Sequence, residues 1–513
     1  MEYKFSYDEV TYPTMIFQDI RPSSIGAVAI LHGVMPDAIE NCRVLELGCG
    51  DGATLLSTAF SMPDAECVGL DLSRSRIEDA TRYAGEIGIG NATFHHLDVM
   101  DYDPESFGKF DFIIAHGLFS WVPDFVREKI LFLYRESLKP NGIGYISYNA
   151  LPGWHMRRII RDAMRFQTEL GEDSIQKTDS GIRFIEFLAE ASRPGSAYKA
   201  LLENELESLR QAKKEVIFHD DLSEENQPFF FKEFNNRIES AGLQFVSESD
   251  PIAFFTGLYP EFARIALDKL WNDPIRREQY FDFIRGTRFR SSLVCLPSAS
   301  PSYVPLVDSV ESLYLSSRAF ALDPNANLSD ESPVAFFATD DSNFSTNHRL
   351  TKTALGVLSS RWAQRLSYME LAEILRSEFE PLELADFNRE SIEFKKHIVE
   401  LIHANIIEAS CFRPRFCSSP KEKPEVSAFA RWQAKIGAPY LTNINGANVS
   451  IENEFVRAAT VLLDGSRTVA ELETDLLKLV QVPSDESEAF ERSIPDLVES
   501  TIGTMRRNAL FVS

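Results

Sequence analysis

Residues 45–54 read LELGCGDGAT and place Gly48, Gly50 and Gly52 at alternate positions, where the apolar run of residues 43–48 enters a glycine loop. The apolar run predicts a short buried strand. Glycine tolerates positive φ and carries no side chain, so a loop of this kind lets the backbone approach a ligand closely. The stretch therefore predicts a strand, a cofactor-binding loop and a helix, and residues further along must decide which cofactor it binds.

Strand-like and helix-like segments alternate after this loop. Four more apolar runs follow, ECVGLDLS, ATFHHLDV, FDFIIAHGL and GIGYISYN, and stretches such as SRSRIEDATRYAGEIG separate them. Such repetition predicts an α/β fold with a parallel sheet and helices on both faces. Ligands of these sheets bind beyond the carboxyl ends of the strands. Glu46, Asp71, Asp98 and His116 all fall at or near those ends.

Two later apolar runs, residues 242–249 and 287–297, follow helical stretches. We expect them to be the last strands of the same seven-stranded sheet, with helical insertions near 150–215 and 250–286 that stand over the strand ends as a lid. The alternative is a separate helical domain over residues 150–285.

Segments rich in proline and serine, PSASPSYVP after Leu296 and SSPKEKPEVS at 418–427, indicate domain boundaries. They predict a first domain over 1–300, which holds the glycine loop, and two mostly helical, winged-helix-like domains over 301–417 and 418–513. The expected recognition helices, SYMELAEILRSEF and TVAELETDLLKLV, hold more acidic than basic residues, which favours protein contact over DNA contact. Since these domains contain none of the expected cofactor residues, we expect cofactor binding to survive their removal.

The glycine loop fits two cofactors. Gly48, Gly50 and Ala53 satisfy the dinucleotide pattern G-x-G-x-x-[GA], whereas Gly48, Gly50 and Gly52 satisfy the G-x-G-x-G pattern of S-adenosylmethionine enzymes. Glu46 supplies a negative charge for the methionine ammonium, and Asp98 a carboxylate for the adenine amino group. The loop therefore favours S-adenosylmethionine.

The remaining acidic residue fits either cofactor, since Asp71 stands where a carboxylate accepts ribose hydroxyls. Together these residues predict an S-adenosylmethionine site. Its expected cofactor-binding residues are Glu46, Gly48, Cys49, Gly50, Gly52, Asp71, Leu72, Asp98, Val99 and His116.

Composition and net charge limit the kinds of partner that the protein can bind. The formal net charge is −25, which disfavours nucleic acid and would attract a basic protein or a cationic small molecule, although solubility alone also explains it. No apolar run approaches the length of a membrane span, and the first residues do not form a signal peptide. Six cysteines without a C-x-x-C motif indicate reduced thiols. We expect a cytoplasmic protein without membrane insertion.

Longer motifs carry a family resemblance. SYDEVTYP, NCRVLELGCGDG, FGKFDFIIAHGLFSWVP and PNGIGYISYNALPGWHMRRIIRD resemble bacterial class I methyltransferases with a methyltransferase regulatory domain. VIFHDDLSEENQPFFFKEF looks like that regulatory segment, and LLDGSRTVAEL is similar to the C-terminal module of the same proteins. Some members are protein lysine methyltransferases of intracellular bacteria that act on outer-membrane surface proteins. The resemblance implies a protein substrate of this kind.

Three residues are candidates for the catalytic region: Tyr12, His116 and Trp121. His116 and Trp121 follow the fourth strand, where substrate and cofactor would meet, and Tyr12 lies with Tyr7 and Phe17 in an aromatic N-terminal segment expected to fold over the cofactor. An aromatic pocket would hold a lysine ammonium and favour its deprotonation. For His116 a hydrogen bond to the cofactor, a role as base and a structural role all stay open.

His95 and His96 adjoin on one strand and would point to opposite faces, so we predict no metal. The sequence also lacks the [DN]-P-P-[YF] motif, which argues against an adenine or glutamine-amide substrate. The leading hypothesis is an S-adenosylmethionine-dependent protein lysine methyltransferase. The alternatives are a small-molecule methyltransferase whose C-terminal modules form a homodimer, and a non-catalytic S-adenosylmethionine-sensing regulatory protein.

Overall fold

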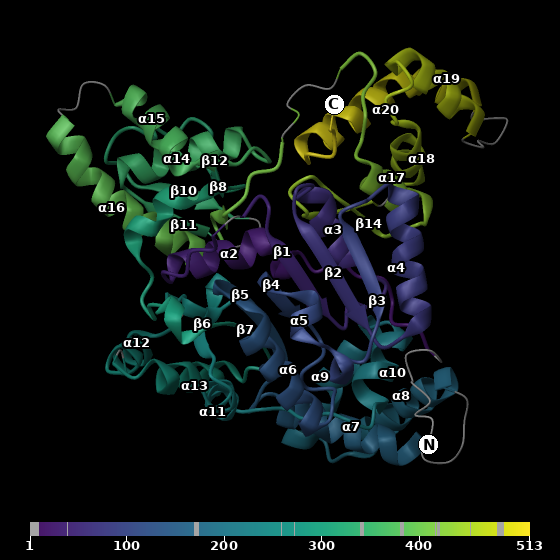
Figure 1. The fold of residues 1–513 in the computed structure, drawn as a ribbon. Coiled ribbons are helices and arrows are strands. Elements are labelled where there is room, and N and C mark those ends of the chain that lie inside the picture. Colours follow the sequence, from purple (N-terminus) through teal and green to yellow (C-terminus); the bar gives the residue numbers. More distant parts are fainter. Residues whose placement is uncertain are drawn as a thin grey trace.

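A computed structural model describes residues 10–37, 39–168, 174–257, 259–270, 272–338, 343–379, 384–415, 417, 421–451, 453–479 and 487–512. Seven strands form one sheet in the order β3-β2-β1-β4-β5-β7-β6 (Figure 1). They are β1 (Arg43–Leu47), β2 (Glu66–Asp71), β3 (Ala92–His96), β4 (Phe110–Ala115), β5 (Leu138–Asn149), β6 (Gln244–Glu248) and β7 (Phe289–Cys295). β7 runs antiparallel to both neighbours, and the remaining pairs are parallel. The predicted seven-stranded α/β sheet is confirmed, except that one of its seven strands, β7, runs antiparallel to the rest.

Side chains alternate between the two faces of the sheet, as the pleat requires. In β1, Val44 packs into one hydrophobic core with α2 (Pro22–Leu31) and α3 (Ala53–Ser61). Leu45 packs into the other core with α6 (Asp124–Ser137) and α11 (Phe231–Ser240). The side chains of Val44 and Leu45 are both fully buried. Helices thus cover both faces, and α4 (Arg74–Ile87) follows β2.

The run expected at 242–249 forms β6 and the run at 287–297 forms β7, and both belong to the main sheet. A purely helical domain over 150–285 is therefore excluded. Four helices separate β5 from α11 and share a core of their own: α7 (Trp154–Thr168), α8 (Ser174–Ala191), α9 (Ala197–Gln211) and α10 (Lys214–Leu222). The shorter insertion between β6 and β7 holds η3 (Pro251–Phe254), α12 (Glu261–Asp268) and α13 (Pro274–Arg285).

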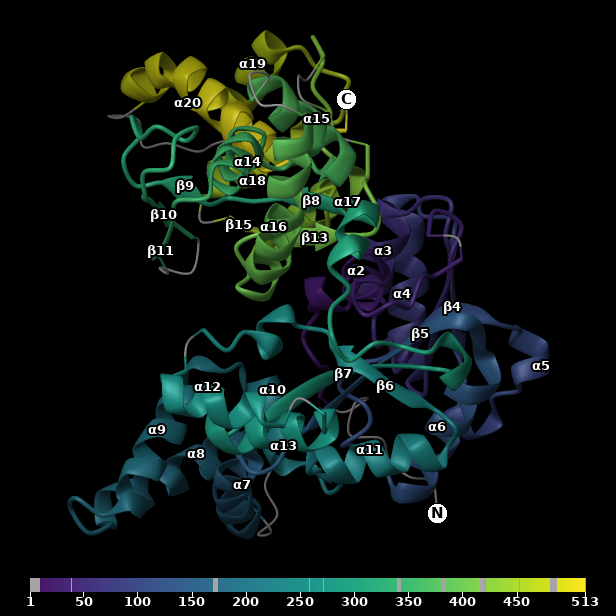
Figure 2. The same ribbon diagram turned by 90° about the vertical axis from the view of Figure 1, so that its left-hand side faces the viewer.

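Short elements complete the first 300 residues: η1 (Gln18–Ile20), η2 (Val99–Asp101), α5 (Pro104–Phe107) and η4 (Pro297–Ala299). Both views place the helices α7 to α13 at one end of the molecule and the helices α14 to α20 at the opposite end (Figures 1 and 2).

The segment after residue 300 forms a second core. Its helices are η5 (Val307–Ser312), α14 (Arg349–Ser360), α15 (Tyr368–Glu378) and α16 (Leu384–His403), and a small sheet joins β12 (Leu366–Ser367), β8 (Tyr314–Ser316) and β13 (Glu408–Ser410). A further sheet, which the sequence did not predict, joins β9 (Phe320–Ala321), β10 (Val334–Phe337) and β11 (Asn343–Thr346). This core includes Ala27, Ile30 and Leu31 of α2, so it is continuous with the first part of the chain.

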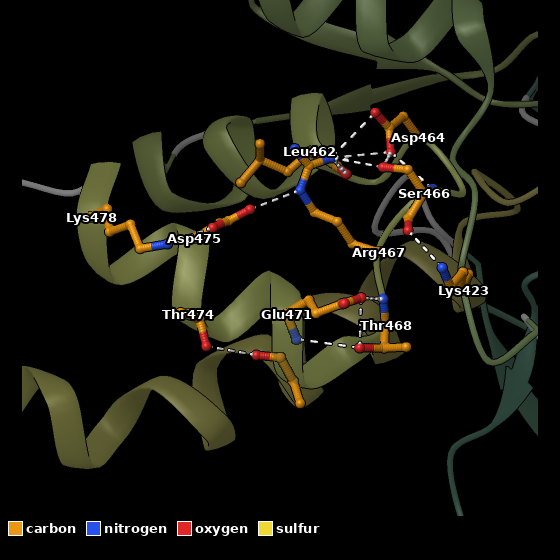
Figure 3. Close-up of polar contacts among 11 residues, drawn as sticks. Lys423, Leu462, Asp464, Ser466, Arg467, Thr468, Glu471, Thr474, Asp475 and Lys478 are labelled. Atoms are coloured by element: carbon orange, nitrogen blue, oxygen red, sulfur yellow. Dashed lines mark hydrogen bonds and ion pairs between the residues drawn. The ribbon is translucent and has the colours of Figure 1, made fainter.

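The last elements are α17 (Ala428–Lys435), β14 (Tyr440–Thr442), β15 (Asn448–Ser450), α18 (Glu454–Leu462), α19 (Val469–Leu479) and α20 (Ser487–Arg507). Arg467 fixes the turn between α18 and α19, where its guanidinium contacts Asp464 and Asp475 (Figure 3). A capping box of Thr468 and Glu471 then starts α19. Because Arg467 is engaged by Asp464 of the turn and Asp475 of α19, this turn presents little positive charge to a phosphate backbone.

The C-terminal elements also pack against the main sheet's helices. Phe429 and Trp432 of α17 share a core with Ala53 and Leu56 of α3 and with Ala84 of α4. α17 therefore covers the helices that follow the first two strands, although the C-terminal elements contain none of the expected cofactor residues. These contacts join positions that no local sequence pattern connects.

Candidate active site

The glycine loop between β1 and α3 has the backbone that its sequence predicts. Gly48, Gly50 and Gly52 all have positive φ, at 70°, 54° and 71°. A Cβ on Gly52 would lie 2.5 Å from the Phe94 ring, whereas a Cβ on Gly50 would meet no atom within 4 Å. The amides of Gly48 and Cys49 both donate to the Leu70 carbonyl, at 2.8 and 3.0 Å. The loop is thus fixed to the end of β2 and leaves open space over Gly50.

Asp71 organises this loop from the end of β2. One carboxylate oxygen accepts the Gly50 amide at 2.8 Å, and the other accepts the Ser73 amide at 2.8 Å. A carboxylate has about four acceptor sites, more than these two amides use. Its position fits the expected ribose contact.

Glu46 is a buried carboxyl group beside the loop, with a relative exposure of 6%. Burial, together with the nearby charges of Asp51 and Asp71, raises its pKa to about 8. Among the described residues no hydrogen-bond donor contacts it. A buried carboxyl group of this kind is complementary to a cationic ligand group, since an opposite charge favours its ionised form.

Asp51, between Gly50 and Gly52, is a site residue that the sequence interpretation missed. It is 8% exposed, accepts the hydroxyl of Thr14, and accepts the Ala53 amide at 3.3 Å. Burial raises its pKa. Its position inside the glycine loop was the only available signal, because Thr14 lies 37 residues away.

The remaining expected cofactor residues lie at the same edge of the sheet. The Leu97 amide donates to the Asp71 carbonyl at 3.0 Å and joins the ends of β3 and β2. Asp98 follows directly and caps η2 by accepting the Met100 amide at 2.9 Å. The structure therefore brings Asp98 close to Asp71 through the backbone.

Three apolar or weakly polar neighbours complete the expected set. Leu72, after β2, is 36% exposed, and Val99 is half-buried at the start of η2. Cys49 is 8% exposed, and burial raises its pKa. Leu72 and Val99 thus offer apolar surface beside Asp71 and Asp98. The Cys49 thiol stays uncharged within the loop.

His116 follows β4 and stands on a hydrogen-bond chain. Its Nδ1 lies 2.9 Å from the Tyr145 hydroxyl, which donates to Ser291 Oγ at 3.0 Å. The Tyr145 oxygen therefore accepts from Nδ1–H, and Nε2 is the unprotonated nitrogen. Burial lowers the pKa of His116 to about 4, so the imidazole is neutral near pH 7. It can accept a hydrogen bond but is a weak base for an ammonium group.

The N-terminal segment contacts this region through Phe17, and not through Tyr12, the residue proposed for the catalytic region. The Phe17 ring packs on His116 with centroids 4.1 Å apart. Tyr12 instead packs against His219 of α10 at 5.6 Å. Tyr7, predicted in the same segment, lies outside the described residues.

Trp121 ends the turn after β4 and faces the long helical insertion. Its ring lies 6.2 Å from that of Trp154, and the Arg161 guanidinium stands over it at 5.7 Å. Both partners belong to α7. Trp121 thus joins the β4–α6 loop to α7, while His116 contacts the N-terminal segment.

The described residues hold neither a metal-binding cluster nor a membrane-spanning helix. In the part of the chain that the structure describes, no cluster of three or more His, Cys, Asp or Glu residues is arranged to hold a metal ion. No helix among the described ranges is both long and apolar enough to cross a membrane.

Three family models match the chain: "Methyltransferase domain" at residues 44–142, "Predicted methyltransferase regulatory domain" at 213–296, and "PKMT, C-terminal winged helix domain" at 422–510. The first extends from β1 through the glycine loop to the start of β5, and the second covers β6 and β7.

Relatives match over most of the length. "Uncharacterized protein RP789" of Rickettsia prowazekii (strain Madrid E) is 31% identical over 469 residues, 90% of this chain and 83% of that protein. The solved structure of PKMT2 from Rickettsia typhi has a TM-score of 0.85 at 26% identity and covers 98% of this chain and 100% of its own. The same protein in complex with AdoHcy gives a TM-score of 0.84, with the same identity and coverage.

Proposed function

Because the chain belongs to the S-adenosylmethionine-dependent methyltransferases that carry a regulatory domain and a PKMT-type winged-helix domain, we propose that it methylates lysine side chains of a protein substrate. The observation that carries the cofactor assignment in this chain is the buried Glu46 carboxyl group beside the glycine loop. The similarity to PKMT2 over the full length, including the C-terminal domain, supports a macromolecular substrate rather than a metabolite.

Each cofactor residue has a separate task in this proposal. Glu46 neutralises the methionine ammonium, Asp71 accepts the ribose hydroxyls, and Asp98 accepts the adenine amino group. Gly50 leaves space for close approach of the ligand. Leu72 supplies apolar surface beside the adenine.

The same proposal assigns the remaining expected residues. Val99 lies beside the adenine with Leu72, and Cys49 contributes backbone to the loop that Gly48 and Gly52 shape. When bound, S-adenosylmethionine supplies a sulfonium methyl group as the electrophile. The chain's own residues align the nucleophile and exclude water, and such alignment lowers a barrier by about 7–11 kcal/mol at best.

A lysine nucleophile must lose a proton, because the ordinary pKa of its amine is about 10.4. His116, whose pKa is about 4, would receive that proton poorly, so we assign it an acceptor hydrogen bond that orients amine or cofactor. Trp121 and Tyr12 are assigned to the aromatic walls, where desolvation lowers the pKa of the amine. A surface or outer-membrane protein as substrate, and a homodimer, rest on the resemblance and the sequence alone.

The test incubates the protein with methyl-labelled S-adenosylmethionine and a bacterial lysate, then separates protein from small molecules and hydrolyses the protein fraction. We expect label in protein and its recovery as methylated lysine. The matched control is Glu46→Gln, which keeps the side-chain shape and removes the charge.

Label confined to small molecules would identify a metabolite methyltransferase. Binding of the cofactor with no transfer to any fraction would instead identify a sensing protein. Label in protein on a residue other than lysine would contradict the lysine assignment alone.

A further inference from the structure

The hairpin of β14 and β15 in the C-terminal domain holds the N-terminal segment of residues 14–21 by its backbone. The Tyr440 hydroxyl accepts the Ile16 amide at 3.0 Å, and the Asn448 amide group donates to the Ile16 carbonyl at 3.1 Å. The Asn448 backbone amide donates to the Gln18 side chain at 3.2 Å. The backbone N–H and the backbone carbonyl of Ile16 are thus both hydrogen-bonded to residues more than 420 positions away.

The other side of the same segment contacts the cofactor region. Thr14 donates to Asp51 within the glycine loop, and the Phe17 amide donates to Thr54 Oγ1 at 3.2 Å. The Phe17 ring packs on His116. Two residues of the segment, Thr14 and Phe17, therefore reach the loop after β1, the start of α3 and the end of β4, which surround the proposed ligand position.

Apolar packing fixes the hairpin's position relative to this segment. Ile16 is buried in the core that contains Phe429 and Trp432 of α17, and Tyr440 packs against that core. Trp432 also donates to Glu86 of α4 at 3.0 Å. The C-terminal domain is thus held both on the N-terminal segment and, separately, on α4.

We propose that Asn448 and Tyr440 are positioning residues for S-adenosylmethionine binding, which act by holding residues 14–18 against the glycine loop. The segment would otherwise have to be ordered by the ligand, and the entropy of ordering several residues would weaken binding. The C-terminal domain is then a component of the cofactor site. This inference rests on the proposed position of that site.

The test compares three variants by calorimetric titration of S-adenosylmethionine and by hydrogen–deuterium exchange. Asn448→Asp removes the donor to the Ile16 carbonyl but keeps the oxygen that accepts the Thr442 hydroxyl. Tyr440→Phe removes only the hydroxyl. Glu86→Ala is the matched control, because it removes a hydrogen bond of the same length between the C-terminal domain and α4 without touching the segment.

We expect the dissociation constant to rise about tenfold for Asn448→Asp and about threefold for Tyr440→Phe, with less than a twofold change for Glu86→Ala. Exchange of the amides at residues 14–18 should accelerate in the first two variants only. The KM for the cofactor should follow the dissociation constant, while kcat at saturating cofactor changes less than twofold.

Faster exchange with unchanged affinity would overturn the inference, because the segment would then be loosened without consequence. An equal loss of affinity in Glu86→Ala would also overturn it, since general docking of the domain would suffice. Should Asn448→Asp fail to fold, Tyr440→Phe decides alone. Wild-type protein that binds no S-adenosylmethionine would refute the proposed function instead, so the two failures are distinguishable.

Discussion

Binding of S-adenosylmethionine should expel a proton from Glu46, and the Glu46→Gln variant should lack that proton release. Burial raises the pKa of Glu46 to about 8, so about nine-tenths of these carboxyl groups carry a proton at pH 7 in the free protein. A bound ammonium group favours the ionised form, and the proton then leaves for the solvent. Glutamine has nearly the same shape and no proton to release.

The expected change in the affinity ratio with pH follows from the same pKa. Between pH 7 and pH 8 the ionised fraction of a carboxyl group with a pKa near 8 rises roughly fivefold. The ratio of wild-type affinity to Glu46→Gln affinity should rise by about that factor. Titration of the ligand's own amino group affects both proteins equally and cancels in the ratio.

Calorimetry in two buffers of different ionisation enthalpy measures the protons released on binding. We expect close to one more proton released at pH 7 by the wild type than by Glu46→Gln. Equal proton release in the two proteins, or an affinity ratio that does not change with pH, would refute the assignment of Glu46 to the ammonium.

The pKa of Glu46 also has a consequence for the free protein's stability. Folding raises this pKa from an ordinary value of 4.5, so the folded state binds more protons than the unfolded state between about pH 4.5 and pH 8. The contribution of Glu46 to stability is therefore fully present below pH 4.5 and is lost as pH rises toward 8. Glu46→Gln should remove this part of the pH dependence in thermal unfolding.

Three further predictions use other features. Asp71→Ala removes the acceptor for two backbone amides and the proposed ribose partner, so calorimetry should show at least a roughly tenfold loss of cofactor affinity, and unchanged affinity in the folded variant would contradict the site. Gly52→Ala forces a Cβ into the Phe94 ring at positive φ and should lower the melting temperature, whereas Gly85→Ala, with open space around it on α4, should raise or preserve it. With a net charge of −25, kcat/KM for a basic protein substrate should fall as salt rises while kcat changes less; a salt-independent kcat/KM would exclude electrostatic recruitment.

Local pattern was sufficient for the sheet and for placing the expected cofactor residues at one edge of it. The strands that hold or precede Glu46, Asp71 and His116 are mostly buried, which is why they read as apolar runs, and parallel strands bring their carboxyl ends to one edge. The later strands, β6 and β7, could be assigned to the same sheet although helical insertions separate them. These features repeat within short windows, where hydrophobic pattern is informative.

Contacts between segments far apart in the sequence could not be predicted from local patterns. Nothing local connects Thr14 with Asp51, or Phe17 with His116, so the sequence could not show which aromatic residue of the segment packs on His116. The β9–β11 sheet was missed because its strands are two to four residues long, too short for a period to emerge.

The docking of the C-terminal elements changes how their role can be tested. Truncation near Pro301 would expose the apolar side chains of Ile30 and Leu31 on α2, both almost fully buried against the segment that follows. Exposing such a side chain costs about 1.5–3 kcal/mol, a large part of the stability of an ordinary domain. Loss of methylation after truncation would therefore report lost stability, not substrate selection.

Single substitutions on the exposed face of the C-terminal domain separate these effects. Glu471 and Glu473 lie on α19, where an acidic helix replaces the basic recognition helix of a DNA-binding protein. Glu473→Lys reverses a charge without disturbing the capping box of Glu471. If α19 contacts a basic protein substrate, this variant should raise the KM for intact protein and leave the KM for a short lysine peptide unchanged. An equal effect on both substrates, at unchanged melting temperature, would exclude α19 from substrate selection.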